Sequence, residues 1–111
     1  MPRRSEARLL DAAPVFAALG DETRLRIVDR LSQHGPMPIV ELTEGTGMTR
    51  QAVTKHLTAL QDAGLLRSAR AGRQRIWELE PKGLEQVQRH LETISEQWDA
   101  AIERLRAFVE G

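Results

Sequence analysis

Apolar residues recur every three or four positions along most of this 111-residue chain, and polar or glycine-containing breaks divide the pattern into segments. Residues 5–19 show a loose helical pattern, which Pro14 either kinks or restarts. A second helix has Asp21 as its N-cap and ends near Gly35. Its apolar positions mark it as a core-facing helix; they are Leu25, Ile27, Val28 and Leu31.

Two short helices across a glycine-containing turn are predicted next. The first runs from about 38 to 44, and the sequence GTG at 45–47 makes the turn. The second begins after Thr49, a suitable N-cap, and ends near Gly64. This order of elements predicts a helix-turn-helix over residues 38–63.

The second of these helices is polar on one side only. On a 3.6-residue period, Val53, Leu57 and Leu60 form an apolar stripe. The outward positions carry side chains that hydrogen-bond base edges and phosphates: Arg50, Gln51, Thr54, Lys55 and Thr58. Because this polar set begins at the first turn, it lies at the end that a recognition helix offers to the major groove of DNA.

The remaining residues predict a hairpin and a long helix. Residues 65–79 form the hairpin, which turns at Ala71 and Gly72 and has arginines near its tip. Pro81 opens the helix, in which apolar residues follow in steps of three and four: Leu84, Val87, Leu91, Ile94, Trp98, Ala101, Leu105 and Phe108. At 1.5 Å per residue this helix extends roughly 42 Å, so we expect part of the stripe to bury against a second copy.

Composition excludes several classes of function. The chain has no Cys, which removes disulfides, thiolate metal sites and cysteine nucleophiles. It has no Gly-rich phosphate loop and no His placed with a Ser and a carboxylate in a catalytic motif, so we do not expect an enzyme. No stretch approaches about 18 apolar residues, so we expect a cytoplasmic protein of one domain, residues 1–111, without a membrane segment.

Charge is unevenly distributed, although the formal net charge of the chain is zero. Residues 49–76 contain six Lys or Arg and one acidic residue, a net charge of +5. Residues 77–111 contain four basic and eight acidic residues, a net charge of −4. The positive third also holds the polar-faced helix, and this combination is expected of a DNA-binding surface.

In their order and spacing, three segments resemble the ArsR family of winged-helix repressors. They are FAALGDETRLRIVDRL at 16–31, IVELTEGTGMTRQAVTKHLTALQDAGLL at 39–66, and RAGRQRIWEL at 70–79 followed by Pro81. The resemblance implies a mainly α fold with a small β-hairpin: a winged helix-turn-helix with a long C-terminal dimerisation helix. It also implies a dimeric repressor that binds double-stranded DNA at a palindromic operator.

The resemblance assigns roles to individual residues. In the family, the second helix of the helix-turn-helix enters the major groove and the wing reaches the flanking DNA. Those roles fall here on Arg50, Gln51, Thr54, Lys55, His56, Arg70, Arg73 and Arg75. The first and last helices form the dimer, here residues 5–19 and 81–110, with interface residues Leu10, Leu91, Ile94, Trp98, Leu105 and Phe108.

Metal-sensing members of the family carry Cys ligands, or paired His and carboxylate ligands, that this chain lacks. Residues 36–46 contain no Cys, and the last helix contains His90 alone. His34 and His56 belong to other elements, so we expect no metal and no cofactor. The last helix is similar to that of the metal-free branch of the family, in which a Trp lies in the dimerisation helix.

Several alternatives stay open at this point. The polar helix face is also consistent with an ordinary solvated face, and the wing arginines with a charged edge that blocks strand aggregation. His56 suits packing or phosphate contact as well as base readout, and Arg24 suits a structural ion pair as well as a phosphate contact. Trp98 either anchors a dimer or lines a ligand pocket, and the effector is unknown. The alternative function is a winged-helix module that binds protein through its heptad helix, but the concentration of positive charge favours DNA.

Overall fold

The computed structural model describes the backbone of residues 4–111 and the side chains of residues 8–111. Three helices come first: α1 (Arg4–Asp11), α2 (Ala13–Leu19) and α3 (Glu22–His34). Pro14 lies in the first turn of α2, where a missing backbone N–H costs no helical hydrogen bond, so it starts a second helix. The predicted N-cap of α3 is confirmed, because the Asp21 carboxylate accepts a hydrogen bond of 3.1 Å from the backbone N–H of Arg24.

The helix-turn-helix consists of α4 (Ile39–Thr43) and α5 (Arg50–Asp62). Thr49 caps α5 as predicted, because its hydroxyl oxygen accepts from the backbone N–H of Ala52 at 3.1 Å. Gly64 adopts φ 81°, and the bonds Gly64 N–H to Gln61 O and Leu65 N–H to Leu60 O complete a Schellman motif. The chain therefore leaves α5 at a fixed angle, directly into the wing.

A three-stranded antiparallel sheet has the order β1-β3-β2, with β1 (Met37–Pro38), β2 (Leu66–Ala71) and β3 (Gln74–Leu79). The predicted hairpin is confirmed, with its turn at Gly72 and Arg73, one residue later than expected. The strand β1 was not predicted, and the short helix expected from about 38 begins at Ile39. A strand of two residues has no period to detect, and β1 exists because Met37 pairs with Trp77, far along the chain.

The core lies where α2 to α5 meet the sheet. Its fully buried side chains come mainly from α5 and the residues that follow it: Ile27, Leu42, Val53, Leu57, Leu60 and Leu65. The α5 stripe predicted from the sequence is thus confirmed as the side that packs inward. Trp77 of β3 and Met37 of β1 close the core from the sheet side.

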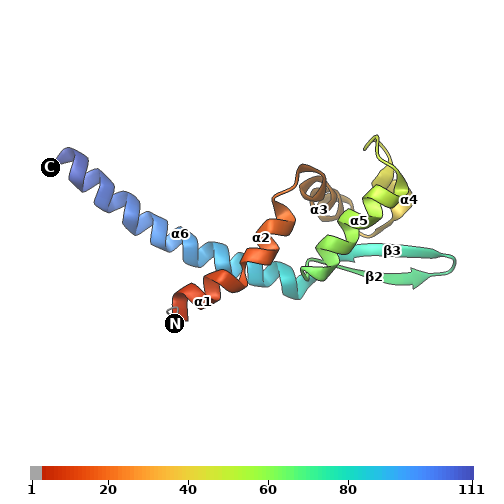
Figure 1. Cartoon of the computed structure of the whole chain (residues 1–111), viewed down its shortest axis with the longest axis horizontal. Coiled ribbons are helices and arrows are strands. Elements are labelled where there is room, and N and C mark those ends of the chain that lie inside the picture. Colours follow the sequence, from red (N-terminus) through yellow and green to blue (C-terminus); the bar gives the residue numbers. More distant parts are fainter. Residues whose placement is uncertain (1–3) are drawn as a thin grey trace.

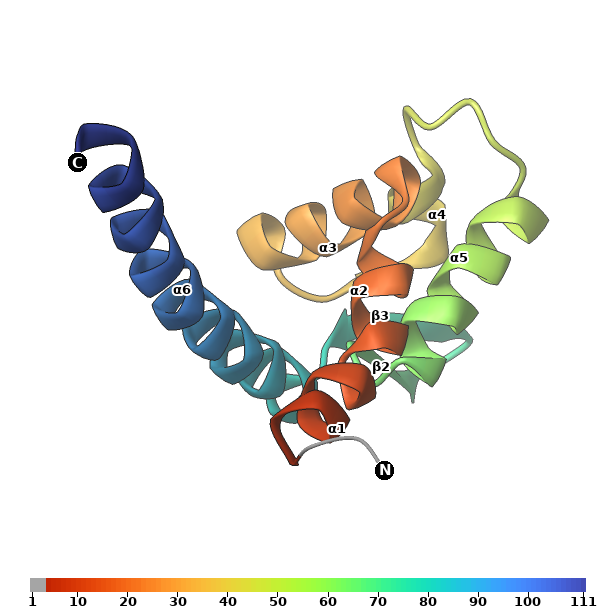
Figure 2. The same cartoon turned by 60° about the vertical axis from the view of Figure 1, so that its left-hand side comes forward.

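The last helix, α6 (Pro81–Glu110), is attached to this body only near its start, where Gly83 and Val87 are buried. Beyond that point α6 leaves the body on the side opposite to the wing, and the molecule measures 63 × 31 × 21 Å (Figure 1). The turned view shows α6 diverging from α3 (Figure 2). Within the described residues, no helix is long and apolar enough to cross a membrane.

Candidate DNA interface

The outer face of α5 is polar and exposed along its first two turns. Arg50, Gln51, Thr54 and Lys55 are all exposed, whereas Val53 between them is fully buried. Together with Thr49 and Ala52 these four residues line one shallow, open hollow at the start of the helix. The structure therefore brings together, on one surface, four of the side chains that the sequence predicted to contact DNA.

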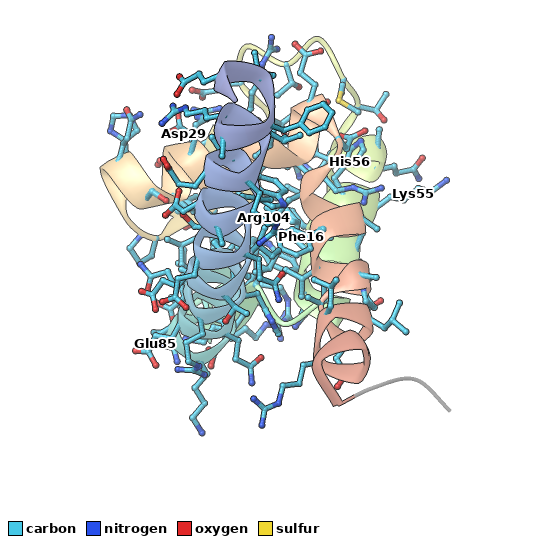
Figure 3. The ribbon with its side chains drawn as sticks, turned by 90° about the vertical axis from the view of Figure 1, so that its left-hand side faces the viewer. Phe16, Asp29, Lys55, His56, Glu85 and Arg104 are labelled. Atoms are coloured by element: carbon cyan, nitrogen blue, oxygen red, sulfur yellow. The ribbon has the colours of Figure 1, made fainter. Side chains whose placement is uncertain are left out.

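Three of these side chains are unengaged in the structure. Among the side chains of residues 8–111, no hydrogen bond or ion pair is made by Arg50, Gln51 or Lys55. Lys55 extends away from the ribbons (Figure 3). Their amide, guanidinium and ammonium groups are thus available to a ligand, and an amide suits adenine while a guanidinium suits guanine.

Thr54 is restricted by a bond within its own helix. Its hydroxyl donates to the backbone carbonyl of Arg50 at 2.8 Å, which uses its only proton. Toward a ligand, Thr54 can therefore only accept a hydrogen bond or present its methyl group. In the major groove these two options correspond to an amino group of adenine or cytosine and to the methyl group of thymine.

The wing carries three arginines at or near its tip. Gly72 has φ 65° while Arg73 has a negative φ, the combination that a type II′ hairpin turn requires. Arg70 and Arg75 are direct cross-strand partners and so share one face of the wing. Both are exposed, and Arg75 donates to the Ser68 hydroxyl at 2.9 Å.

Arg67 is the basic residue of this region that is already neutralised. Its Nε contacts Glu78 at 2.7 Å and its Nη1 contacts Glu80 at 3.2 Å. The hydrogen bond that Arg67 donates to Glu78, together with the negative charge of that carboxylate, raises the pKa of Arg67. The positive charge available to a partner therefore comes from α5 and the wing tip, not from the base of the wing.

His56 is placed differently from the other predicted contacts. Its side chain is 20% exposed, and Nδ1 accepts a hydrogen bond of 3.2 Å from Nε of Arg24. In Figure 3 it lies close to the ribbon at the α2–α3 junction, while Lys55 points outward beside it. The sequence left His56 open between packing and DNA contact, and it did not reveal that Arg24 is its partner.

Most of the apolar residues predicted to form the dimer are exposed in the described part of the chain. Leu10 of α1 is exposed, as are the α6 side chains Leu91, Trp98, Leu105 and Phe108. Phe108 is 85% exposed and Trp98 is 65% exposed, values unusual for aromatic side chains. Ile94 is partly buried. Among the described residues no three His, Cys, Asp or Glu side chains gather in a way that could hold a metal ion.

A helix-turn-helix with an exposed polar second helix, followed by a hairpin with exposed arginines near its tip, defines a winged helix-turn-helix DNA-binding protein. Comparison with known proteins agrees with this class. Residues 19–69 match a family model described as a helix-turn-helix domain. This match covers the helix-turn-helix and the beginning of the wing.

Two curated relatives are transcription regulators. YuzN of Bacillus subtilis, an uncharacterized HTH-type transcriptional regulator, is 44% identical over 68 residues, covering 56% of this chain and 74% of YuzN. The arsenical resistance operon repressor of Escherichia coli is 30% identical over 100 residues, covering 86% of this chain and 79% of the repressor.

Solved structures give the same assignment. An ArsR-like transcriptional regulator from Rhodococcus sp. RHA1 is 35% identical with a TM-score of 0.71, covering 94% of each chain. The homodimeric winged helix-turn-helix DNA-binding domain of Mb0332 from Mycobacterium bovis is 25% identical with a TM-score of 0.66, covering 87% of this chain and 89% of that one. The chain belongs to the ArsR family of helix-turn-helix transcriptional regulators, and its relatives are regulators, not enzymes.

Proposed function

We propose that this regulator is a cytoplasmic homodimeric repressor that reads a palindromic operator with α5 and holds the flanking phosphates with its wing. The observation that carries this proposal is the single surface on which Arg50, Gln51, Thr54 and Lys55 stand exposed at the start of α5. Repression agrees with the relative from Escherichia coli, whose name is that of a repressor.

The wing supports the proposal through its charge. Two arginines directly opposite each other on a hairpin destabilise it, and Arg70 and Arg75 are such a pair. Arg73 adds a third positive charge at the turn between them. Contact with a phosphate backbone would relieve this repulsion. Arg67 is paired with carboxylates of its own chain, whereas the described contacts of Arg70 and Arg73 include no carboxylate.

The apolar surface of α6 supports the dimer. Its exposed residues continue the stripe that Leu84 and Val87 begin inside the body, so a second copy would extend the same packing. The homodimeric Mb0332 domain has the same fold. Two-fold symmetry of such a dimer presents two α5 helices to DNA, and the operator is then an imperfect palindrome with half-sites about one helical turn, or a simple multiple, apart.

Selection of bound duplexes from a random pool tests this function. We expect a palindromic consensus for the native chain. The double variant Ile94→Glu/Leu105→Glu, which places charge in the apolar stripe, should sediment as a monomer and select at most a half-site. A consensus without two-fold symmetry, or a dimer that survives the double substitution, would contradict the dimeric readout. Retention of no duplex at all would favour the alternative of a protein-binding module.

A further inference from the structure

A polar cluster joins α5 to the start of α3, beside the surface proposed to contact DNA. Arg24 donates through Nε to Nδ1 of His56 at 3.2 Å, and an oxygen of Asp21 lies 3.8 Å from the same nitrogen. Arg24 also donates through Nη1 to the carbonyl oxygen of Ala18 at 3.4 Å. One guanidinium thus connects the end of α2, the first turn of α3 and the middle of α5.

The bond from Arg24 selects one protonation state of His56. A ring nitrogen that accepts a hydrogen bond carries no proton, so neutral His56 must carry its proton on Nε2. A protonated imidazole has N–H on both nitrogens and cannot accept from Arg24, whose guanidinium is always charged. Protonation therefore replaces an attractive contact by two like charges at hydrogen-bonding distance.

The other elements packed on α5 do not offer His56 another charged partner. α2 has no titratable side chain, α4 contributes Glu41, and β2 contributes Arg67 and Arg70. Within the part of the chain that the structure describes, none of these three side chains hydrogen-bonds or ion-pairs with His56. On α5 itself the adjacent charge is the exposed Lys55. Asp21 attracts a protonated ring, but its carboxylate is already the cap of α3.

We propose that His56 is a positioning residue of the recognition helix, not a base reader, and that sequence discrimination requires its neutral form, held by Arg24. The proposal rests on the proposed readout of the operator by α5. Because His56 is largely covered and the adjacent Leu57 is fully buried, a change at this contact shifts the helix against α3 instead of moving a free side chain. Hydrogen bonds to base edges need exact placement, whereas attraction to phosphates tolerates such a shift.

The consequence is a pH dependence of specificity that differs from that of affinity. Lowering the pH until His56 takes up a proton therefore reduces the discrimination between operator and random DNA. Binding to random DNA does not fall, because protonation adds positive charge. We expect the ratio of operator affinity to random-duplex affinity to drop at least about threefold, the worth of one net hydrogen bond.

Competition binding at constant ionic strength, at pH 8 and pH 5.5, tests the proposal. His56→Asn keeps an acceptor in place of Nδ1 but does not titrate, so its affinity ratio should change less than about twofold between the two pH values. His34→Asn, at an exposed position at the end of α3, should keep the full pH dependence of the native chain. A native pH dependence in His56→Asn, or its loss in His34→Asn, would overturn the proposal.

Two further measurements distinguish a failure of the proposed readout by α5 from a failure of the proposed role of His56. If Gln51→Ala at pH 8 leaves discrimination unchanged, the proposed readout by α5 fails, and this result does not depend on His56. NMR of the imidazole nitrogens in the native chain at pH 8 reads the tautomer directly and requires no variant to fold. Protonation of Nε2 with Nδ1 as acceptor is expected, and a proton on Nδ1 would overturn the proposed role of Arg24.

Discussion

Replacing Gly83 by Ala should destabilise the protein, although alanine is the better helix former. Gly83 lies in the first turn of α6 against the backbone of Gly64, the residue with positive φ that follows α5. A Cβ atom at Gly83 would stand 1.8 Å from the Gly64 carbonyl oxygen and 2.7 Å from its carbonyl carbon. Both distances are below the 3.0 Å that real Cβ contacts respect, and the obstacle is backbone. To relieve the clash, α6 must move away from the end of α5.

The magnitude follows from two opposing effects. In an exposed helix, Gly→Ala gains about 1 kcal/mol from helix propensity. Overpacking a well-packed site costs typically about 1–3 kcal/mol, and the upper end applies here because neither helix backbone can turn aside as a side chain would. We expect a net loss of at least about 1 kcal/mol, which corresponds to a fall in Tm of roughly 4–8 °C for a chain of this size.

Thermal unfolding of the Gly83→Ala variant, measured at the same protein concentration as the native chain, gives the net change in Tm. Gln86→Ala, at an exposed position in the following turn of α6, is the matched control and should change Tm little. The sign of the change in Tm shows whether helix propensity or overpacking is the larger effect. An increase in Tm for Gly83→Ala would mean that propensity outweighs the contact with Gly64, and the described attachment of α6 would then be wrong.

Three further outcomes are expected. The pKa of Asp21 is held below its ordinary value, chiefly by the hydrogen bond from the backbone N–H of Arg24. The stability that the Asp21 carboxylate contributes is therefore present above pH 3.8 and is lost as the pH falls below that value, and this part of the acid dependence of unfolding should be absent in Asp21→Asn. Asp21→Ala, which removes the cap, should lower Tm at neutral pH. Arg67→Gln should change DNA affinity much less than Arg73→Gln in the same binding assay, because Arg67 is already paired with Glu78 and Glu80; an equal loss would contradict this. Adding Zn²⁺ or a chelator should leave operator affinity unchanged within about twofold, and a stoichiometric metal that shifts affinity tenfold would refute the expectation of no metal.

Local signals in the sequence predicted most of the fold. The caps Asp21 and Thr49 and the glycine after α5 are short-range features whose hydrogen bonds form within a few residues, so pattern and position sufficed. The strand β1 was not predicted because its two residues form a strand only by pairing with β3, which is a long-range contact. Such pairing leaves no periodic trace in the chain.

The same distinction applies to the candidate site. The exposed face of α5 followed from helical spacing, because an apolar stripe on one side places the polar set on the other. The neutralisation of Arg67 by Glu78 required the strand register, and the bond between Arg24 and His56 required the packing of α3 on α5. The charge pattern of the sequence groups Arg67 with the arginines of the wing tip, and only the three-dimensional arrangement shows that Arg67 is already paired.

In the proposed function, α5 reads the DNA sequence while the wing holds phosphates. Competition binding of Gln51→Ala, Arg73→Ala and Arg75→Ala to the selected operator and to a scrambled duplex, at several salt concentrations, tests it most directly. Gln61→Ala, an exposed glutamine on the last turn of α5, is the matched control and should bind both duplexes as the native chain does.

The two elements should respond differently. Gln51→Ala should cost about 1–3 kcal/mol on the operator and relax preference at one or two base pairs, with little effect on scrambled DNA. Each wing variant should weaken both duplexes alike and lower the salt slope by about one, because a phosphate contact releases counterions without reading sequence. Equal losses on operator and scrambled DNA for Gln51→Ala would show that α5 is not the element that reads the sequence.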